Sequence, residues 1–143
     1  MNNDTLRSVS VRRTAAGRFV ATNARGVELP FTGGGEGAGD TFSPVELMLA
    51  AIAGCTALDV DALTSRRAEP ESFELLATAD KVRDQAGNRL ENIEVTFKVR
   101  FPAGEAGDAA RSVLPDMVAR SHDRLCTVTR TVERGTPVTP RIE

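Results

Sequence analysis

Two cysteines are the residues of this chain best suited to covalent chemistry. Cys55 follows an apolar run, and Cys126 lies far from it, close to the end of the sequence. A thiol that reduces peroxides must ionise and be accessible, and a second thiol should capture its sulfenic acid before further oxidation. A cysteine in an apolar helix can equally be a small buried hydrophobic residue. The residues alone leave both interpretations of Cys55 open.

Two further side chains near the cysteines can titrate or bind a metal. At about 100° per residue, Asp59 shares the helical face of Cys55, where its charge raises the pKa of a thiol. His122 is the only histidine and precedes Cys126 by four residues. It is either a solvent-facing helix residue or the partner of a nucleophilic thiol. Both cysteines with His122 and Asp59 match zinc ligand types, but their spacing lacks Cys-x-x-Cys pairs. We therefore predict neither a metal nor an organic cofactor.

A long helix is expected to position Cys55. Ser43-Pro44-Val45-Glu46 is typical of a helix start, with Ser as N-cap, Pro at the first helical position and Glu completing a capping box. The helix should run from Pro44 to about Arg66. Glu46 projects almost opposite to Cys55, so we interpret it first as a capping residue. A catalytic role for Glu46 would need an irregular helix near Gly54.

The remaining pattern predicts strands before and after this helix, and a second helix. The helix residues around Cys55 are apolar on all sides, so one face should meet a sheet and the other a partner subunit. A second helix is expected over Gly104–Arg124, broken or kinked near Pro115. We predict strands at Ser8–Arg13, Arg18–Asn23, Gly26–Phe31, Phe73–Val82, Leu90–Phe101 and Thr127–Glu133. This order favours an α+β fold, with an antiparallel sheet packed on a long buried central helix in a single domain over residues 1–143.

Composition excludes several classes of protein. With 143 residues, 41% hydrophobic and 27% charged, the chain is typical of one soluble globular domain. A net charge of -2 and the absence of Trp and Tyr argue against nucleic-acid binding. The polar start Met1–Asp4 lacks a secretory signal pattern, and the apolar run Leu47–Ala53 is too short to cross a bilayer. We expect a cytoplasmic protein without membrane contact.

Two segments resemble motifs of one family. Ser43–Cys55 resembles the central-helix motif of the OsmC/Ohr family, and Ser121–Thr129 resembles its second-cysteine motif. The order of the elements is also similar, so the resemblance covers nearly the whole chain. It implies an OsmC-like fold and an intertwined homodimer with each active site at the subunit interface.

The resemblance also implies an activity and roles for four residues. Family enzymes are thiol peroxidases that act on organic hydroperoxides. By this likeness Cys55 is the peroxidatic thiol, Cys126 resolves its sulfenic acid, and a dithiol reductant such as a lipoyl protein resets the disulfide. An arginine of the N-terminal strands should hold the Cys55 thiolate, with Arg18 preferred and Arg13 next. Glu46 is the candidate for the catalytic glutamate of the family.

Two departures point to a less characterised OsmC-like branch. Val45 stands where the organic-hydroperoxide branch has its glutamate, and Glu46 is turned about 100° round the helix from that place. Thr127 stands where that branch has a proline after its second cysteine. Two alternatives to a peroxidase follow. One is a protein that binds a small apolar ligand at the dimer interface and uses its cysteines as redox sensors. The other is a structural module with inert thiols.

Overall fold

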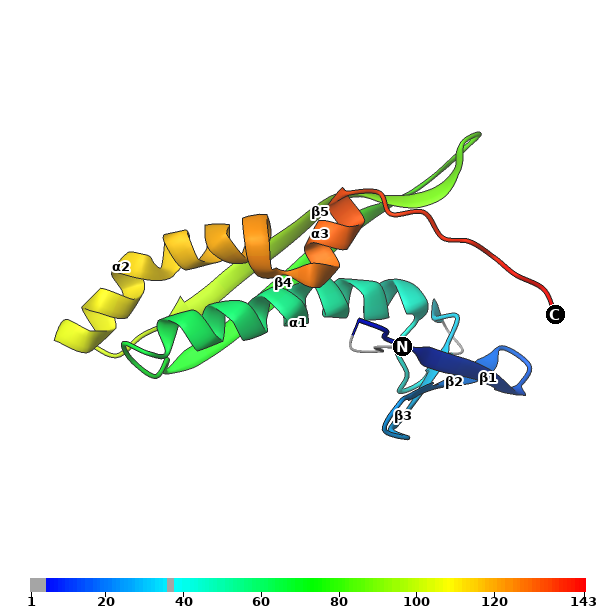
Figure 1. Cartoon of the computed structure of the whole chain (residues 1–143), viewed down its shortest axis with the longest axis horizontal. Coiled ribbons are helices and arrows are strands. Elements are labelled where there is room, and N and C mark those ends of the chain that lie inside the picture. Colours follow the sequence, from blue (N-terminus) through cyan, green and yellow to red (C-terminus); the bar gives the residue numbers. More distant parts are fainter. Residues whose placement is uncertain (1–4, 36–37) are drawn as a thin grey trace. The chain divides into compact units, whose positions relative to one another are not determined.

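The chain folds into antiparallel strands and helices, which confirms the α+β class (Figure 1). The structure, a computed structural model, describes residues 5–35 and 38–143. The chain divides into two compact units, Met1–Met48 and Leu49–Glu143. A single domain over residues 1–143 stays a prediction. The polar start Met1–Asp4, expected to carry no secretory signal, lies outside the described residues.

The first unit contains a three-stranded antiparallel sheet in the order β1-β2-β3. Its strands are β1 (Val9–Ala15), β2 (Arg18–Asn23) and β3 (Glu28–Thr32). The three predicted strands are confirmed: β2 has the predicted bounds, and the ends of β1 and β3 are shifted by one or two residues. Gly17, with a φ of 70°, turns the chain between β1 and β2. Pro30 lies in β3 at the edge of this sheet, where its missing N–H costs no ladder bond.

Helix α1 (Pro44–Thr64) begins at the predicted capping box. The backbone N–H of Glu46 donates to Ser43 Oγ at 3.2 Å, and the N–H of Ser43 donates to Glu46 Oε1 at 2.8 Å. Both donors would otherwise lack an intrahelical partner. The predicted helix and its start are therefore confirmed, and its end lies two residues earlier than expected.

Within the second unit, α1 buries one face only. The buried residues recur at every fourth position and are Ile52, Thr56, Val60 and Thr64. Leu58, on another face, is 74% exposed. The expectation of a helix enclosed on all sides is thus not met by the described part of one chain. A partner subunit as the missing cover stays a prediction.

By length and composition α1 would also be able to cross a membrane, with a mean hydropathy of 1.6 over 18 residues. The run Leu47–Ala53 is part of this longer apolar helix, so the length of the run is not the argument against a membrane span. Core helices of soluble proteins can have the same length and hydropathy. The buried hydroxyl of Thr56 indicates such a core helix, because it makes a hydrogen bond with Ser121 of another element.

The second unit has a two-stranded antiparallel hairpin of β4 (Ser72–Asp84) and β5 (Gly87–Arg100). Side chains of β5 alternate between half-buried and exposed from Ile93 to Arg100, as the sequence pattern predicts. Three of its half-buried residues, Ile93, Val95 and Phe97, line a pocket together with residues of α1 and α2 (Glu105–Arg120). Both helices run alongside the hairpin (Figure 1). The apolar face of the hairpin and the helices form the core of this unit.

Two predictions for the C-terminal part differ from the structure. Helix α2 continues through Pro115, so the predicted break is absent there and a kink stays a prediction, and the change of geometry comes in the π-helical turn η2 (Ser121–Leu125). Thr127–Glu133, expected as a strand, is the helix α3. Its alternating β-branched residues favour a strand, but Cys126 caps the segment as a helix because its sulfur accepts the N–H of Thr129.

Candidate active site

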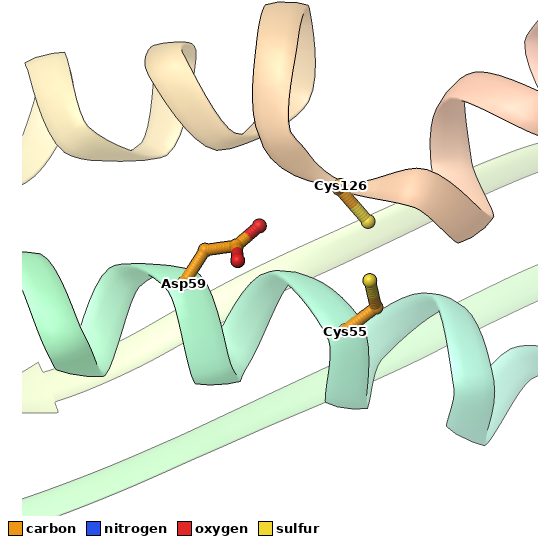
Figure 2. A group of neighbouring side chains, drawn as sticks. All are labelled: Cys55, Asp59 and Cys126. Atoms are coloured by element: carbon orange, nitrogen blue, oxygen red, sulfur yellow. The ribbon is translucent and has the colours of Figure 1, made fainter. Parts of the chain in front are cut away.

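The two cysteines lie side by side although they are distant in sequence. Cys55 is half-buried on α1, Cys126 is fully buried, and both are free thiols. The two sulfur atoms and a carboxylate oxygen of Asp59 all lie within 4.8 Å of one another. Figure 2 shows both sulfurs pointing toward the same gap between α1 and the η2–α3 junction. A disulfide needs the sulfurs at about 2.0 Å, so a modest movement would join them.

The junction of η2 and α3 aims Cys126 at α1. Cys126 ends η2 and precedes α3, with an extended backbone at φ −72° and ψ 99°. Its N–H donates to Ser121 O at 2.8 Å, which fixes the turn. Its thiol donates to Thr129 Oγ1 at 3.2 Å, while Thr129 N–H donates to the sulfur at 3.4 Å. A π-helical turn is rare and often marks a functional site.

Asp59 is held by a chain of buried hydroxyl groups. Ser121 Oγ donates to Asp59 Oδ2 at 2.8 Å and lies 2.8 Å from Thr56 Oγ1. A hydroxyl has one proton, so Thr56 donates to Ser121. Ser121 is fully buried and Thr56 nearly so. This arrangement fixes the Asp59 carboxylate one helical turn from Cys55, on the face that the helical periodicity predicts.

The surroundings of Cys55 favour its protonated form. Burial raises the pKa of the Cys55 thiol, and the neighbouring Cys126 thiol and Asp59 carboxylate raise that pKa further. A hydrogen bond from the Val128 backbone acts in the opposite direction. Within the described residues, no arginine or lysine contributes to this shift. Activation of Cys55 as a thiolate therefore calls for a cation in addition to these groups.

His122 lies outside the cluster of sulfurs and carboxylate. Its Nδ1 bonds to Asp123 at 2.8 Å and its Nε2 to Glu133 at 2.7 Å, and its side chain is 53% exposed. Hydrogen bonds to Asp123 and Glu133 raise the pKa of His122. The solvent-facing interpretation of His122 is thus confirmed. Pairing with a nucleophilic thiol is wrong, because both ring nitrogens are engaged by carboxylates.

The two other predicted site residues belong to the first unit. Arg18 opens β2 opposite Thr32. Glu46 uses its carboxylate in the capping box of α1. Their catalytic roles beside Cys55 stay predictions. The sequence placed Ser121 at the start of the second-cysteine motif but gave it no role, because its hydrogen bond to Asp59 spans 62 positions.

A pocket of about 460 Å³ is lined by residues that neighbour the two cysteines in the chain. Ile52 and Thr56, the buried α1 residues on either side of Cys55, belong to its wall, as does Thr129 beside Cys126. Apolar residues of β5, α2 and α3 complete the wall, and three charged or titratable residues also line it. The apolar residues include Ile93, Val95, Phe97, Val118 and Val132. The charged or titratable residues are His122, Asp123 and Glu133.

The chain is similar to proteins of one family in sequence and in fold. An uncharacterized protein of Mycobacterium tuberculosis is 27% identical over 128 residues, covering 90% of each chain. An OsmC-like protein of unknown function from Vibrio cholerae superposes with a TM-score of 0.72 at 15% identity, covering 90% of this chain and 94% of the other. The organic hydroperoxide resistance protein OhrB of Bacillus subtilis has a TM-score of 0.56 at 20% identity, with 92% of each chain covered.

These likenesses agree with the resemblance of the two cysteine motifs. The solved structures share the α+β fold over almost the whole length of the chain. The family model described as OsmC-like protein matches residues 37–141, which include both cysteines and every residue of the thiol–carboxylate cluster, and the chain therefore belongs to the OsmC-like protein family.

Proposed function

We propose that this protein is a thiol-dependent peroxidase that reduces organic hydroperoxides, with Cys55 as the peroxidatic and Cys126 as the resolving thiol. The observation that carries the proposal is the approach of two free thiols within 4.8 Å. The similar Bacillus subtilis protein is named for resistance to organic hydroperoxides, and this name supports the class of substrate.

The half-buried thiol reacts first and the buried thiol second. The Cys55 thiolate attacks a peroxide oxygen, the O–O bond breaks, and the organic fragment leaves as an alcohol after taking up a proton. Cys55 becomes a sulfenic acid. The sulfur of Cys126 then attacks the Cys55 sulfur and releases water, which closes the disulfide. A dithiol such as a lipoyl protein reduces the disulfide by exchange.

From the family resemblance we propose Arg18 as the cation that activates Cys55, with Arg13 as the second candidate. Both belong to the first unit, on β2 and β1. The protein acts as a cytoplasmic homodimer. Leu58 on α1, which is 74% exposed, is an apolar side chain that a partner subunit would cover.

A second candidate function is binding of a small apolar molecule, with the cysteines as redox sensors. The pocket of about 460 Å³ favours it, because its size suits a small ligand and its wall is mostly apolar. In that case the thiols would react slowly with peroxides, in keeping with the raised pKa of Cys55, whose first cause is burial.

The deciding experiment mixes reduced, chelator-treated protein with cumene hydroperoxide and counts free thiols. We expect rapid loss of two thiols per chain. Cys55→Ser should be inert, and Cys126→Ser should stop at the sulfenic acid, which a dimedone probe labels. Arg18→Ala should slow the first step while Arg25→Ala leaves it unchanged. Thiols that react no faster than free cysteine would favour the ligand-binding function.

A further inference from the structure

We propose that Cys55, Cys126 and Asp59 form a binding site for a zinc ion, with both sulfurs and one carboxylate oxygen as ligands and a fourth position open to water. These three atoms lie within 4.8 Å of one another (Figure 2). Around a tetrahedral zinc ion the ligand atoms would be about 3.3–3.8 Å apart, given metal–ligand distances near 2.0–2.3 Å. A contraction of at most about 1–1.5 Å would complete the site.

The spacing of two ligands supports a metal site on a helix. Cys55 and Asp59 are four residues apart on α1, so both side chains project from one face. Paired ligands at this spacing are a common way for a helix to hold zinc. Cys126 approaches from the η2–α3 junction and supplies the third ligand from a separate element. The site thus needs no Cys-x-x-Cys pair, whose absence made the sequence alone argue against a metal.

Neighbouring hydrogen bonds hold two of the ligands in place. The buried Ser121 hydroxyl donates to one oxygen of Asp59, so the other oxygen can serve as ligand. Thr129 N–H donates to the Cys126 sulfur, a bond that strengthens when the sulfur is a thiolate. Outer hydrogen bonds of this kind orient metal ligands and raise their affinity.

Charge balance also favours a divalent cation. Once zinc has displaced the two thiol protons, the three ligands carry three negative charges, and within residues 49–143 no lysine or arginine forms an ion pair with Asp59. A divalent ion reduces the net charge to −1. Two sulfur ligands favour zinc over magnesium or calcium, which prefer oxygen ligands.

Zinc and the disulfide exclude each other. The disulfide uses both sulfurs, so it cannot form while zinc holds them as thiolates. Oxidation by a hydroperoxide takes two electrons from the two thiolates and two protons from solvent, forming the disulfide, an alcohol and water and releasing the ion. This last consequence rests on the proposed peroxidase function, whereas zinc binding itself does not.

The test uses the reduced, full-length chain after removal of metals by a chelator. Cobalt(II) serves as a spectroscopic probe for zinc, because tetrahedral thiolate sites give charge-transfer absorption. We expect one cobalt ion per chain with this absorption, and its displacement by one equivalent of zinc. Cys55→Ser and Cys126→Ser should each lose a large part of the absorption. The absence of thiolate-to-cobalt absorption in the wild-type protein would overturn the site.

Asp59→Asn tests the third ligand. We expect its zinc affinity, measured by competition with a chromogenic chelator, to fall at least about 10-fold, the scale on which even outer-shell changes act. Asp61→Asn is the matched control, an exposed carboxylate on the same helix, and should bind like wild type. Equal affinity of the two variants would overturn Asp59 as ligand. Circular dichroism verifies folding, and zinc protection of wild-type thiols from iodoacetamide gives a reading independent of any variant.

The two proposals fail in distinguishable ways, because the peroxide reaction is measured with chelator present. Turnover of cumene hydroperoxide without any thiolate–cobalt absorption would overturn the zinc site alone. Cobalt binding as expected, with thiols inert toward peroxide, would overturn the peroxidase alone.

Discussion

The buried hydroxyl of Ser121 donates a 2.8 Å hydrogen bond to the carboxylate of Asp59, joining η2 to the helix that bears Cys55. Thr56 bonds to the same hydroxyl at 2.8 Å. Ser121 therefore links the two elements that supply the sulfurs, and the position of Cys126 relative to Cys55 depends on it.

Ser121→Ala should lower the free energy of unfolding by about 1–3 kcal/mol, because it leaves polar groups of Thr56 and Asp59 without this buried partner. Urea denaturation of the reduced protein measures the change. Ser112→Ala, on the exposed face of α2, is the control and should stay within about 0.5 kcal/mol of wild type. Equal stability of both variants would show that the hydroxyl chain is dispensable.

Asp59→Asn should lower the pKa of Cys55, because removal of a nearby negative charge favours the thiolate. Burial, the first cause of the raised pKa, is left in place, so only part of the shift should disappear. The pH dependence of iodoacetamide alkylation, measured in chelator on a Cys126→Ser background, reports the change as faster reaction near neutral pH. An unchanged profile would contradict the electrostatic role of Asp59.

His122 should make stability depend on pH. Its pKa is raised above 6.5 by hydrogen bonds to Asp123 and Glu133. The two carboxylates therefore stabilise the folded state through the charged imidazole. This stabilisation is complete at pH values below the unfolded-state pKa of 6.5, and it is lost as the pH rises through the folded-state pKa. For exposed pairs the effect is about 0.2–1 kcal/mol.

Two measurements check this prediction. The chain has one histidine, so its NMR titration gives the folded pKa directly. Urea midpoints on both sides of that pKa should differ for wild type and converge for His122→Gln. A folded pKa at or below the ordinary value would mean that the two carboxylates do not stabilise the charged imidazole.

Gly107→Ala should destabilise the protein although alanine is the better helix former. Gly107 is buried in the first turn of α2, and an added Cβ would lie 1.7 Å from the carbonyl oxygen of Pro102. Backbone must move, at a typical cost of about 1–3 kcal/mol for overpacking. Ala109 is exposed on the same helix, and Ala109→Gly should lower the free energy of unfolding by about 1 kcal/mol. This control measures the difference in helix propensity between alanine and glycine without a steric clash. A gain in thermal midpoint for Gly107→Ala would refute the close approach.

Substitutions of Glu46 can distinguish its role in the helix cap from a role in catalysis. Glu46→Ala should lower the free energy of unfolding by about 0.5–2 kcal/mol, the usual scale for loss of a cap. Glu46→Gln should stay near wild type, because its amide oxygen can accept the Ser43 N–H as the carboxylate does. Loss of the peroxide reaction in Glu46→Gln at unchanged stability would assign the carboxylate a part in catalysis.

The sequence by itself determined the local elements that depend on neighbouring residues. The Ser43–Glu46 pattern predicts the capping box because its hydrogen bonds span only three positions. The alternation in β5 predicts its apolar face because side chains of a strand point to opposite sides in turn. The two cysteine motifs also identified the family, whose model matches residues 37–141.

Only the tertiary structure decided which distant groups meet. Thr127–Glu133 has the composition of a strand, but its cap at Cys126 and the preceding π-helical turn make it a helix. The approach of Cys126 to Cys55, and of Ser121 to Asp59, depends on how η2 packs on α1. Such contacts arise from the burial of whole faces rather than from any short pattern. The sequence therefore indicated which residues could react, and the packing of the second unit determined which of them stand together.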